Sequence, residues 1–217
     1  MGRDKRALPF AGSRFMDLVA RELDCYPERL FSVAAPQEVP PPGFTVVPDQ
    51  RPGCGPLGGI VAGLEACRCD ALLAVACDMP LFRAGLARYL EAFLCDSYDA
   101  FLIADRTGRI HPLCGIYRKT ALPVLKEQLQ AGHYRLMSAL ERLRVKYVPL
   151  EHSAYPDRLL TNVNTWEEYQ DLLRQERRPG SVRGKKLRQD HLFVPPHPGV
   201  EPPGPESSRH QARRPRI

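Results

Sequence analysis

The feature that most constrains the fold is the apolar run "ALLAVA", residues 71–76, in which no side chain is polar. A continuous apolar run of this length is typical of a strand whose two faces are both covered. The chain carries a helical pattern opened by proline over 56–67 before this run and a second helical pattern over 84–94 after it. A covered strand between two helices indicates a parallel sheet with crossover helices, so we expect an α/β fold.

Further segments continue this alternation on both sides. We expect helices over 13–24, 120–130, 136–143 and 165–174, and strands over 30–33, 44–47, 100–104 and 145–149. Ser13 is the expected N-cap of the first helix, and Thr165 with Glu168 has the spacing of a capping box at the last one. The turn "ADRTGR" leads into "IHPLCGIY", residues 110–117, which predicts an antiparallel element in the otherwise parallel sheet.

The positive charge of the chain is confined to its C-terminal part. Residues 177–217 hold ten Lys or Arg and three Asp or Glu, a net charge of +7, whereas residues 1–176 hold 21 and 22, a net charge of −1. The same C-terminal part holds eight of the 22 prolines and few large apolar residues, too few to form a core. We expect one domain over 1–176 and a basic, proline-rich, disordered tail over 177–217, which is a solvated appendage rather than a nucleic-acid site.

The cysteine spacing indicates a reducing compartment, and the length of the apolar runs argues against a membrane protein. The spacing of the seven cysteines fits neither a metal site nor a disulfide framework. We therefore expect the cysteines to be reduced and to serve as small, buried, apolar side chains. No apolar run reaches the roughly 18 to 20 residues that span a bilayer, and the first residues lack the apolar stretch of a signal peptide. We therefore expect a cytoplasmic protein that does not bind membranes.

Two stretches carry residue types that a core or a plain surface does not need. In "DQRPGCGPLGGIVAGL", residues 49–64, a strand ends at Asp49 and glycines precede a helix. This predicts a close approach of the backbone to a ligand or, alternatively, a tight strand-to-helix turn. In "AVACDMP", residues 74–80, Asp78 follows the most apolar strand, at the sheet edge where α/β proteins bind ligands. A carboxylate there suits a divalent cation such as Mg²⁺, and a turn or helix cap is the alternative.

A third such stretch is "NVNTWEEY", residues 162–169. Asn162 and Asn164 flank one apolar residue in front of the capped helix. Their alternation places both amides on the same side of an extended segment, where they could reach a ligand or a metal-bound water. Shaping the turn before the helix is the alternative.

Taken in order, "GPLGGI", "CDMP", "HPLCGIY" and "NVNTWEEY" resemble the molybdenum cofactor guanylyltransferases, and the resemblance extends over residues 1–175. It implies a Rossmann-like nucleotidyltransferase fold, with a mostly parallel sheet, an antiparallel element and helices on both faces. It also implies transfer of GMP from GTP to the terminal phosphate of molybdopterin, with release of pyrophosphate. GTP and molybdopterin or the molybdenum cofactor are then the substrates, Mg²⁺ is the cofactor, and a molybdoenzyme or its chaperone is the protein partner.

The resemblance carries the functional residues of that family onto this chain. Lys5 falls on the lysine that contacts the nucleotide phosphates, Asp49 on the aspartate that contacts guanine or the ribose, and Asp78 on the metal-binding aspartate. Lys5 and Asp78 are thus the expected catalytic residues. Lys5, Asp49 and Asp78 are the expected nucleotide- and cofactor-binding residues, with Asp78 as the metal ligand.

Three further positions matter for the resemblance. Asn164, or Asn162, is implied to support the metal from the opposite side. His111-Pro112 lies in the part that resembles the pterin-binding region, although a polar residue at a strand end is the alternative. Members of the family often carry an asparagine at the end of the second strand, where this chain has "SVA", residues 32–34. Selectivity for guanine is therefore less well supported by that position.

The chain opens with "MGRDKRALP", which matches only the end of the family's first loop, LAGGxSxRMGxDK. We therefore expect the domain over 1–176 to be N-terminally incomplete, without the family's first strand and the first half of its phosphate loop. Two other functions stay open at this point. One is a cytidylyltransferase acting on the same pterin, and the other is a non-catalytic remnant that binds a partner or a pterin without turnover.

Overall fold

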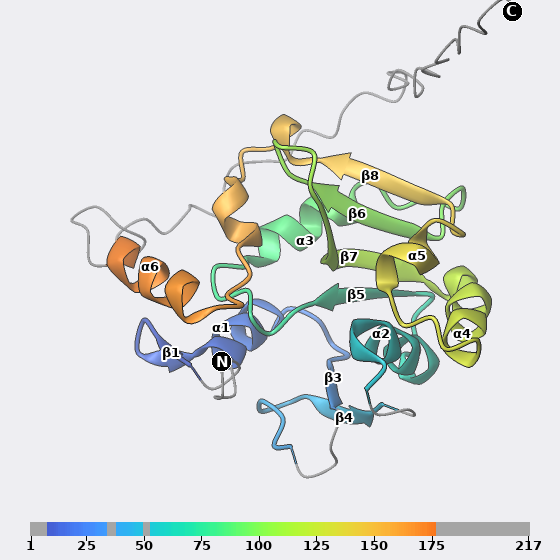
Figure 1. Cartoon of the computed structure of the whole chain (residues 1–217), viewed down its shortest axis with the longest axis horizontal. Helices are drawn as coiled ribbons and strands as arrows, with labels where there is room; N and C mark the ends of the chain where they lie inside the picture. The colour runs from blue at the N-terminus through green and yellow to red at the C-terminus, as the bar shows by residue number, and fades with distance from the viewer. Residues whose placement is uncertain (1–7, 34–37, 50–52, 177–217) are drawn as a thin grey trace, which may run out of the picture. The chain divides into compact units, whose positions relative to one another are not determined.

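The computed structural model describes residues 8–33, 38–49 and 53–176, which lie in one compact unit of the chain (Figure 1). Its largest sheet has four strands in the order β5-β7-β6-β8. β5 (Ala71–Val75), β6 (Ala100–Ala104) and β8 (Val145–Pro149) run in the same direction, and β7 (Ile110–Arg118) lies antiparallel between β5 and β6. The antiparallel element predicted from "IHPLCGIY" is therefore confirmed.

A helix joins this sheet to a second one, which has two parallel strands. β3 (Leu30–Val33) pairs with β4 (Thr45–Pro48), with Ser32 opposite Val47. α2 (Gly55–Ala66) follows β4, packs against β3, β4 and β5, and leads into β5. The predicted crossover from one strand through a helix to the next is therefore present. Within the described residues, however, the strands on its two sides belong to separate sheets.

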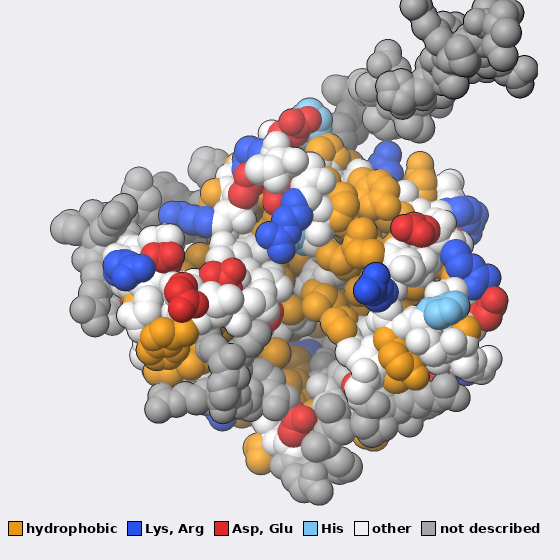
Figure 2. Space-filling view, in the orientation of Figure 1, with side chains coloured by type: hydrophobic (Ala, Val, Ile, Leu, Met, Phe, Trp, Pro, Cys, Tyr) orange, Lys and Arg blue, Asp and Glu red, His pale blue; other side chains and the backbone are white. Residues whose placement is uncertain are grey.

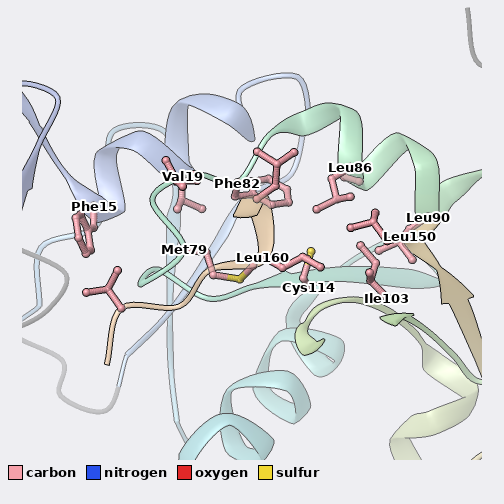
Figure 3. Close-up of a cluster of buried hydrophobic side chains, with 14 of the residues drawn as sticks. Phe15, Val19, Met79, Phe82, Leu86, Leu90, Ile103, Cys114, Leu150 and Leu160 are labelled. Atoms are coloured by element: carbon pink, nitrogen blue, oxygen red, sulfur yellow. The ribbon is translucent and has the colours of Figure 1, made fainter. Parts of the chain in front are cut away.

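Helices cover both faces of the four-stranded sheet, as predicted. Besides α2 they are α1 (Phe15–Glu22), α3 (Ala84–Glu91), α4 (Leu122–Gln130), α5 (Leu136–Leu140), α6 (Trp166–Glu176) and the short 3₁₀ segments Lys119–Ala121, Leu150–His152 and Asp157–Leu160. Alternate residues of β6 pack into two different clusters. Phe101 and Ile103 join a cluster with α1 and α3, part of which Figure 3 shows, and Ala100 and Leu102 join a cluster with α2, α4 and α5. The fold thus has three layers, with the sheet in the middle.

The first helix begins later than predicted because its first turn is replaced by a hairpin. β1 (Pro9–Phe10) pairs with β2 (Ser13–Arg14), and the turn residues Ala11 and Gly12 have φ angles of 49° and 79°. Arg14 takes the N-cap position of α1 without a side-chain cap, and the Ser13 hydroxyl accepts a hydrogen bond from Arg21 at 2.8 Å. The prediction that Ser13 caps the helix is wrong, since its pairing with β1 keeps it in a strand.

β5 is less buried than a central strand, although apolar side chains pack on both of its faces. Ala71, Leu73 and Val75 border the first cluster, and Leu72 and Ala74 border the second. All five residues are half-buried, because β5 is the last strand in the order and, within the described residues, pairs with β7 alone. Figure 2 shows hydrophobic side chains at the surface over the four-stranded sheet. The run "ALLAVA" therefore forms an edge of the described sheet.

The cysteines follow the prediction only in part. All seven are free, as expected. Cys54, Cys67 and Cys114 are buried, whereas Cys25, Cys69 and Cys95 are exposed and Cys77 is half-buried. None of the helices in the described part of the chain combines the length and the apolar character needed to cross a membrane.

Candidate functional site

Asp78 lies beyond the carboxyl end of β5, and the chain is fixed on both sides of it. Met79 donates its backbone N–H to the carbonyl oxygen of Ala76 at 3.3 Å, and its side chain is buried. From the end of the domain, Val163 donates its backbone N–H to the Asp78 carbonyl oxygen at 3.0 Å. Asn162 Nδ2 donates to Asp78 Oδ1 at 3.3 Å. Because the side chain of Val163 is fully buried, it anchors "NVN" against the turn that carries Asp78.

The two asparagines of this segment have different surroundings. Asn162 reaches the Asp78 carboxylate, whereas Asn164 is exposed and donates its backbone N–H to the Glu168 carboxylate. Thr165 donates its backbone N–H to the same carboxylate at 2.9 Å, and the Glu168 N–H donates to Thr165 Oγ1 at 3.1 Å. The predicted capping box is therefore confirmed. Of the two asparagines considered beside the metal position, Asn162 hydrogen-bonds Asp78 through its side-chain amide.

Asp49 follows β4 directly and faces the start of α2. Its backbone N–H donates to the Val33 carbonyl oxygen at 2.9 Å, which extends the pairing of β3 with β4 by one residue. Ser32 Oγ donates to Asp49 Oδ1 at 2.6 Å. Ser32 stands at the strand end where the family often has an asparagine. Its hydroxyl therefore hydrogen-bonds Asp49, the residue that the resemblance places beside the nucleotide.

His111, on β7, forms a nearly buried pair with Asp105. His111 Nε2 and Asp105 Oδ2 are 2.9 Å apart, and the side chains are 10% and 11% exposed. Asp105 Oδ1 accepts hydrogen bonds from the backbone N–H groups of Thr107 and Arg109 and from the Thr107 hydroxyl. Burial raises the pKa of Asp105, but the hydrogen bonds from His111 and this turn outweigh it and hold the pKa below its ordinary value. The charged carboxylate thus fixes the ring of His111.

Sequence reasoning did not single out Asp105. An aspartate that opens a turn such as "DRTG" is a recognised turn signal, since its carboxylate accepts hydrogen bonds from backbone groups further along the turn. That signal would have located the turn. The contact of Asp105 with His111 depends on the pairing of β6 with β7, in which Ile103 lies opposite His111.

Asp49 and Asp78 lie at the same edge of the α/β layer. Asp49 follows the carboxyl end of β4, α2 returns the chain to the opposite edge, and Asp78 follows the carboxyl end of β5. This carboxyl edge is where open α/β sheets bind ligands. Over residues 8–33, 38–49 and 53–176, no three His, Cys, Asp or Glu side chains converge as a metal cluster. Lys5, the third expected site residue, lies outside the described residues.

Comparison with known proteins identifies the family of the chain. The family described as MobA-like NTP transferase domain matches residues 1–146. A probable molybdenum cofactor guanylyltransferase from Carboxydothermus hydrogenoformans is 31% identical over 177 residues, covering 80% of this chain and 89% of the relative. A second one, from Clostridium perfringens, is 29% identical over 179 residues, with the same coverage of 80% and 89%.

A solved structure agrees at the level of the fold. The crystal structure of molybdopterin-guanine dinucleotide biosynthesis protein A from Archaeoglobus fulgidus superposes with a TM-score of 0.64 at 20% identity, covering 79% of this chain and 89% of that one. The fold is therefore the α/β nucleotidyltransferase fold. With a family match over more than half of its length and a relative at 31% identity of which it covers 89%, the chain belongs to the MobA-like NTP transferase family and is a nucleotidyltransferase.

Proposed function

We propose that this chain is a molybdenum cofactor guanylyltransferase, which transfers GMP from GTP to the phosphate of molybdopterin and releases pyrophosphate. The relatives named above carry that activity in their names and match the chain over most of both lengths. The structural observation that supports the proposal best is the anchored carboxylate of Asp78, held at the ligand-binding edge by Asn162 and Val163. We place the reaction in the cytoplasm, with a molybdoenzyme or its chaperone as the recipient of the product.

The reaction itself needs little acid–base chemistry from the protein. An oxygen of the acceptor phosphate forms a bond to the α-phosphorus of GTP, and the bond from that phosphorus to the pyrophosphate oxygen breaks with its electron pair. The acceptor phosphate is already an anion near pH 7, so no general base has to remove a proton. Catalysis then consists of bringing two anions together in line and stabilising the charge that develops.

Asp78 and Asn162 are suited to hold Mg²⁺ together with the nucleotide. Mg²⁺ is usually bound by one or two carboxylates, with water and substrate phosphates completing its shell, and a single carboxylate beside an amide fits that pattern. The ion, when bound, would neutralise charge on the phosphates. Asp49, beside the start of α2, would contact the nucleoside, and Lys5 would contact the phosphates. His111, fixed by Asp105, would lie on the acceptor side.

The proposal is tested by incubating the full chain with molybdopterin, Mg²⁺ and an equimolar mixture of GTP and CTP, each labelled at the α-phosphate. We expect label from GTP in the product and almost none from CTP. Asp78→Asn should lower the rate at least about 100-fold, since metal-assisted charge stabilisation contributes several kcal/mol. Asp96→Asn is the matched control, because that carboxylate is 97% exposed and pairs with Arg118. Preferential use of CTP, or a chain that transfers neither nucleotide, would contradict the proposal.

A further inference from the structure

The hydrogen bond between His111 and Asp105 determines which nitrogen of the histidine ring carries a proton. His111 Nε2 lies 2.9 Å from Asp105 Oδ2, and the pKa of Asp105 is held below its ordinary value. An ionised carboxylate only accepts hydrogen bonds, so the proton between the two side chains must belong to Nε2. Among the described residues, Nδ1 has no hydrogen-bond partner and is not a fully buried atom. The ring therefore offers Nδ1 to a ligand.

The other oxygen of Asp105 closes the turn that follows β6. Asp105 Oδ1 accepts hydrogen bonds from the backbone N–H of Thr107 at 2.9 Å, the Thr107 hydroxyl at 2.6 Å and the backbone N–H of Arg109 at 3.0 Å. An asparagine oxygen could accept the same bonds, because aspartate and asparagine form turns of this kind alike. The turn thus needs one oxygen but no negative charge. What requires a carboxylate is the hydrogen bond that Asp105 accepts from His111.

His111 lies at the carboxyl edge, next to the turn that carries Asp78. β7 runs antiparallel beside β5, and just beyond β5 the Ala76 N–H donates to the Leu113 carbonyl oxygen at 3.0 Å. Two residues after Ala76, the chain reaches Asp78. Two residues before Leu113, it passes through His111. Because the two strands are antiparallel, both steps lead out of the sheet at the same edge. The topology therefore places the histidine beside the expected metal ligand.

We infer that Asp105 is a positioning residue, which holds His111 in the tautomer that presents Nδ1 as a hydrogen-bond acceptor to molybdopterin. The group that fits this atom is an N–H donor, which the pterin ring carries. The phosphate of molybdopterin does not fit, because a phosphate only accepts hydrogen bonds. The inference rests on the proposed function. It adds the residue that determines the state of His111 and the kind of substrate group that His111 meets.

The first part of the test inverts the tautomer of His111 by Asp105→Asn. The asparagine oxygen can keep the three hydrogen bonds of the turn, which directs the NH₂ group at Nε2. The proton of the neutral ring must then move to Nδ1. The same change beside a catalytic histidine leaves the geometry intact and gives the wrong tautomer. Nitrogen-15 NMR of the histidine rings at pH 8 should therefore show the proton on Nε2 in the wild type and on Nδ1 in Asp105→Asn.

The second part measures the dissociation constants of molybdopterin and of GTP by calorimetry with the full chain. Asp105→Asn should weaken molybdopterin binding about tenfold, because two donors then face each other, and should change GTP binding less than about twofold. His111→Gln keeps an N–H donor toward Asp105 but has no atom in place of Nδ1, so it should cost the same factor. The double variant should bind molybdopterin no more weakly than His111→Gln. Asp157→Asn is the matched control, because that carboxylate pairs with Arg106 of the same turn.

The outcomes separate this inference from the proposed function. A wild-type ring with its proton on Nδ1, or on both nitrogens at pH 8, refutes the tautomer. If His111→Gln binds molybdopterin as tightly as the wild type, Nδ1 is not used, and GMP transfer by the wild type leaves the proposed function standing. A merely structural role of Asp105 would lower the melting temperature and add to the effect of His111→Gln, which also refutes the inference. A wild type that transfers no nucleotide contradicts the proposed function, whereas the NMR and the molybdopterin affinities still decide the role of Asp105.

Discussion

The charged pair that joins the beginnings of two strands is Asp99 with Arg144. Arg144 Nη2 and Nε donate to the two carboxylate oxygens of Asp99 at 2.7 and 3.0 Å, and the backbone N–H of Arg144 donates at 3.1 Å. The Asp99 N–H donates in turn to the Arg144 carbonyl oxygen at 2.7 Å. Asp99 is buried, whereas the side chain of Arg144 is 61% exposed. The pair fixes the start of β8 against the residue that precedes β6.

The hydrogen bonds from Arg144 lower the pKa of Asp99 from 3.8 to about 2. Because folding favours the ionised form, this stabilisation is complete above about pH 4 and is lost as the pH falls towards 2. We expect Asp99→Asn to lower the free energy of unfolding by about 1 kcal/mol at pH 7, a value reduced by the exposure of Arg144. Urea denaturation from pH 7 to pH 3 should show the difference from the wild type shrinking below pH 4. Asp171→Asn is the control, because Asp171 and its partner Arg174 are both exposed. If the stability difference between Asp99→Asn and the wild type did not change with pH, the pair with Arg144 would not be its cause.

Residues of the site were predictable to different degrees. Asp78 could be located because it lies just beyond the most apolar strand, and its position at the carboxyl edge follows from strand direction alone. The contact of Ser32 with Asp49 joins residues 17 positions apart, and it depends on the register of two strands and the path of α2. Sequence patterns give the elements but not that register. The contact of Asn162 with Asp78 also required the structure, because it joins residues 84 positions apart.

At the scale of elements, α6 links the capping box to the site. Tyr169 and Leu172 of this helix are buried, and the Tyr169 hydroxyl donates to the Pro9 carbonyl oxygen at 2.6 Å. The capping box lies directly after "NVN", so the beginning of α6 and the support of Asp78 are continuous in the chain. We expect Thr165→Ala to lower the free energy of unfolding by about 1 kcal/mol, the usual cost of a lost cap. Thr165→Ser keeps the hydroxyl and should stay within about 0.3 kcal/mol of the wild type in the same denaturation series. Equal losses for Ala and Ser would indicate that packing, not the cap, carries the effect.

The elements that sequence predicted well are those decided by local pattern. β3, β6 and β8 have the predicted bounds, because short apolar runs with β-branched or aromatic residues between turns favour strands locally. The start of α1 differs from the prediction because Ser13 pairs with Phe10 across the hairpin. This strand pairing competes with the helix-capping role of Ser13. β5 was predicted from its apolar run, but its place at the edge of the described sheet depends on which strands lie beside it. That neighbourhood is not encoded within the run itself.

At the scale of the whole molecule, α2 packs on two sheets that each have an unpaired edge. Over the described residues, β3 pairs only with β4 and β5 pairs only with β7, yet the same helix contacts β3, β4 and β5. A strand that paired with both β3 and β5 would join the two-stranded and the four-stranded sheet into one. Such a strand would cover the half-buried residues of β5. The resemblance to the guanylyltransferases predicts a first strand followed by the LAGG half of the phosphate loop.

We therefore expect a version with about 15 to 20 residues added before Met1, carrying an apolar strand and LAGGxSxR, to be more stable than the chain as written. Covering β5 should contribute at least about 2 kcal/mol, which corresponds to a rise in melting temperature of about 4 to 8 °C for a domain of this size. GTP should also bind more tightly, because the added glycines supply backbone N–H groups to the phosphates. The matched control has the same extension with two prolines in the strand, which remove backbone donors and prevent pairing. Equal melting temperatures for the extended chain and the proline control would refute the added strand, whereas a stabilised chain with unchanged GTP affinity would refute only the role of the loop.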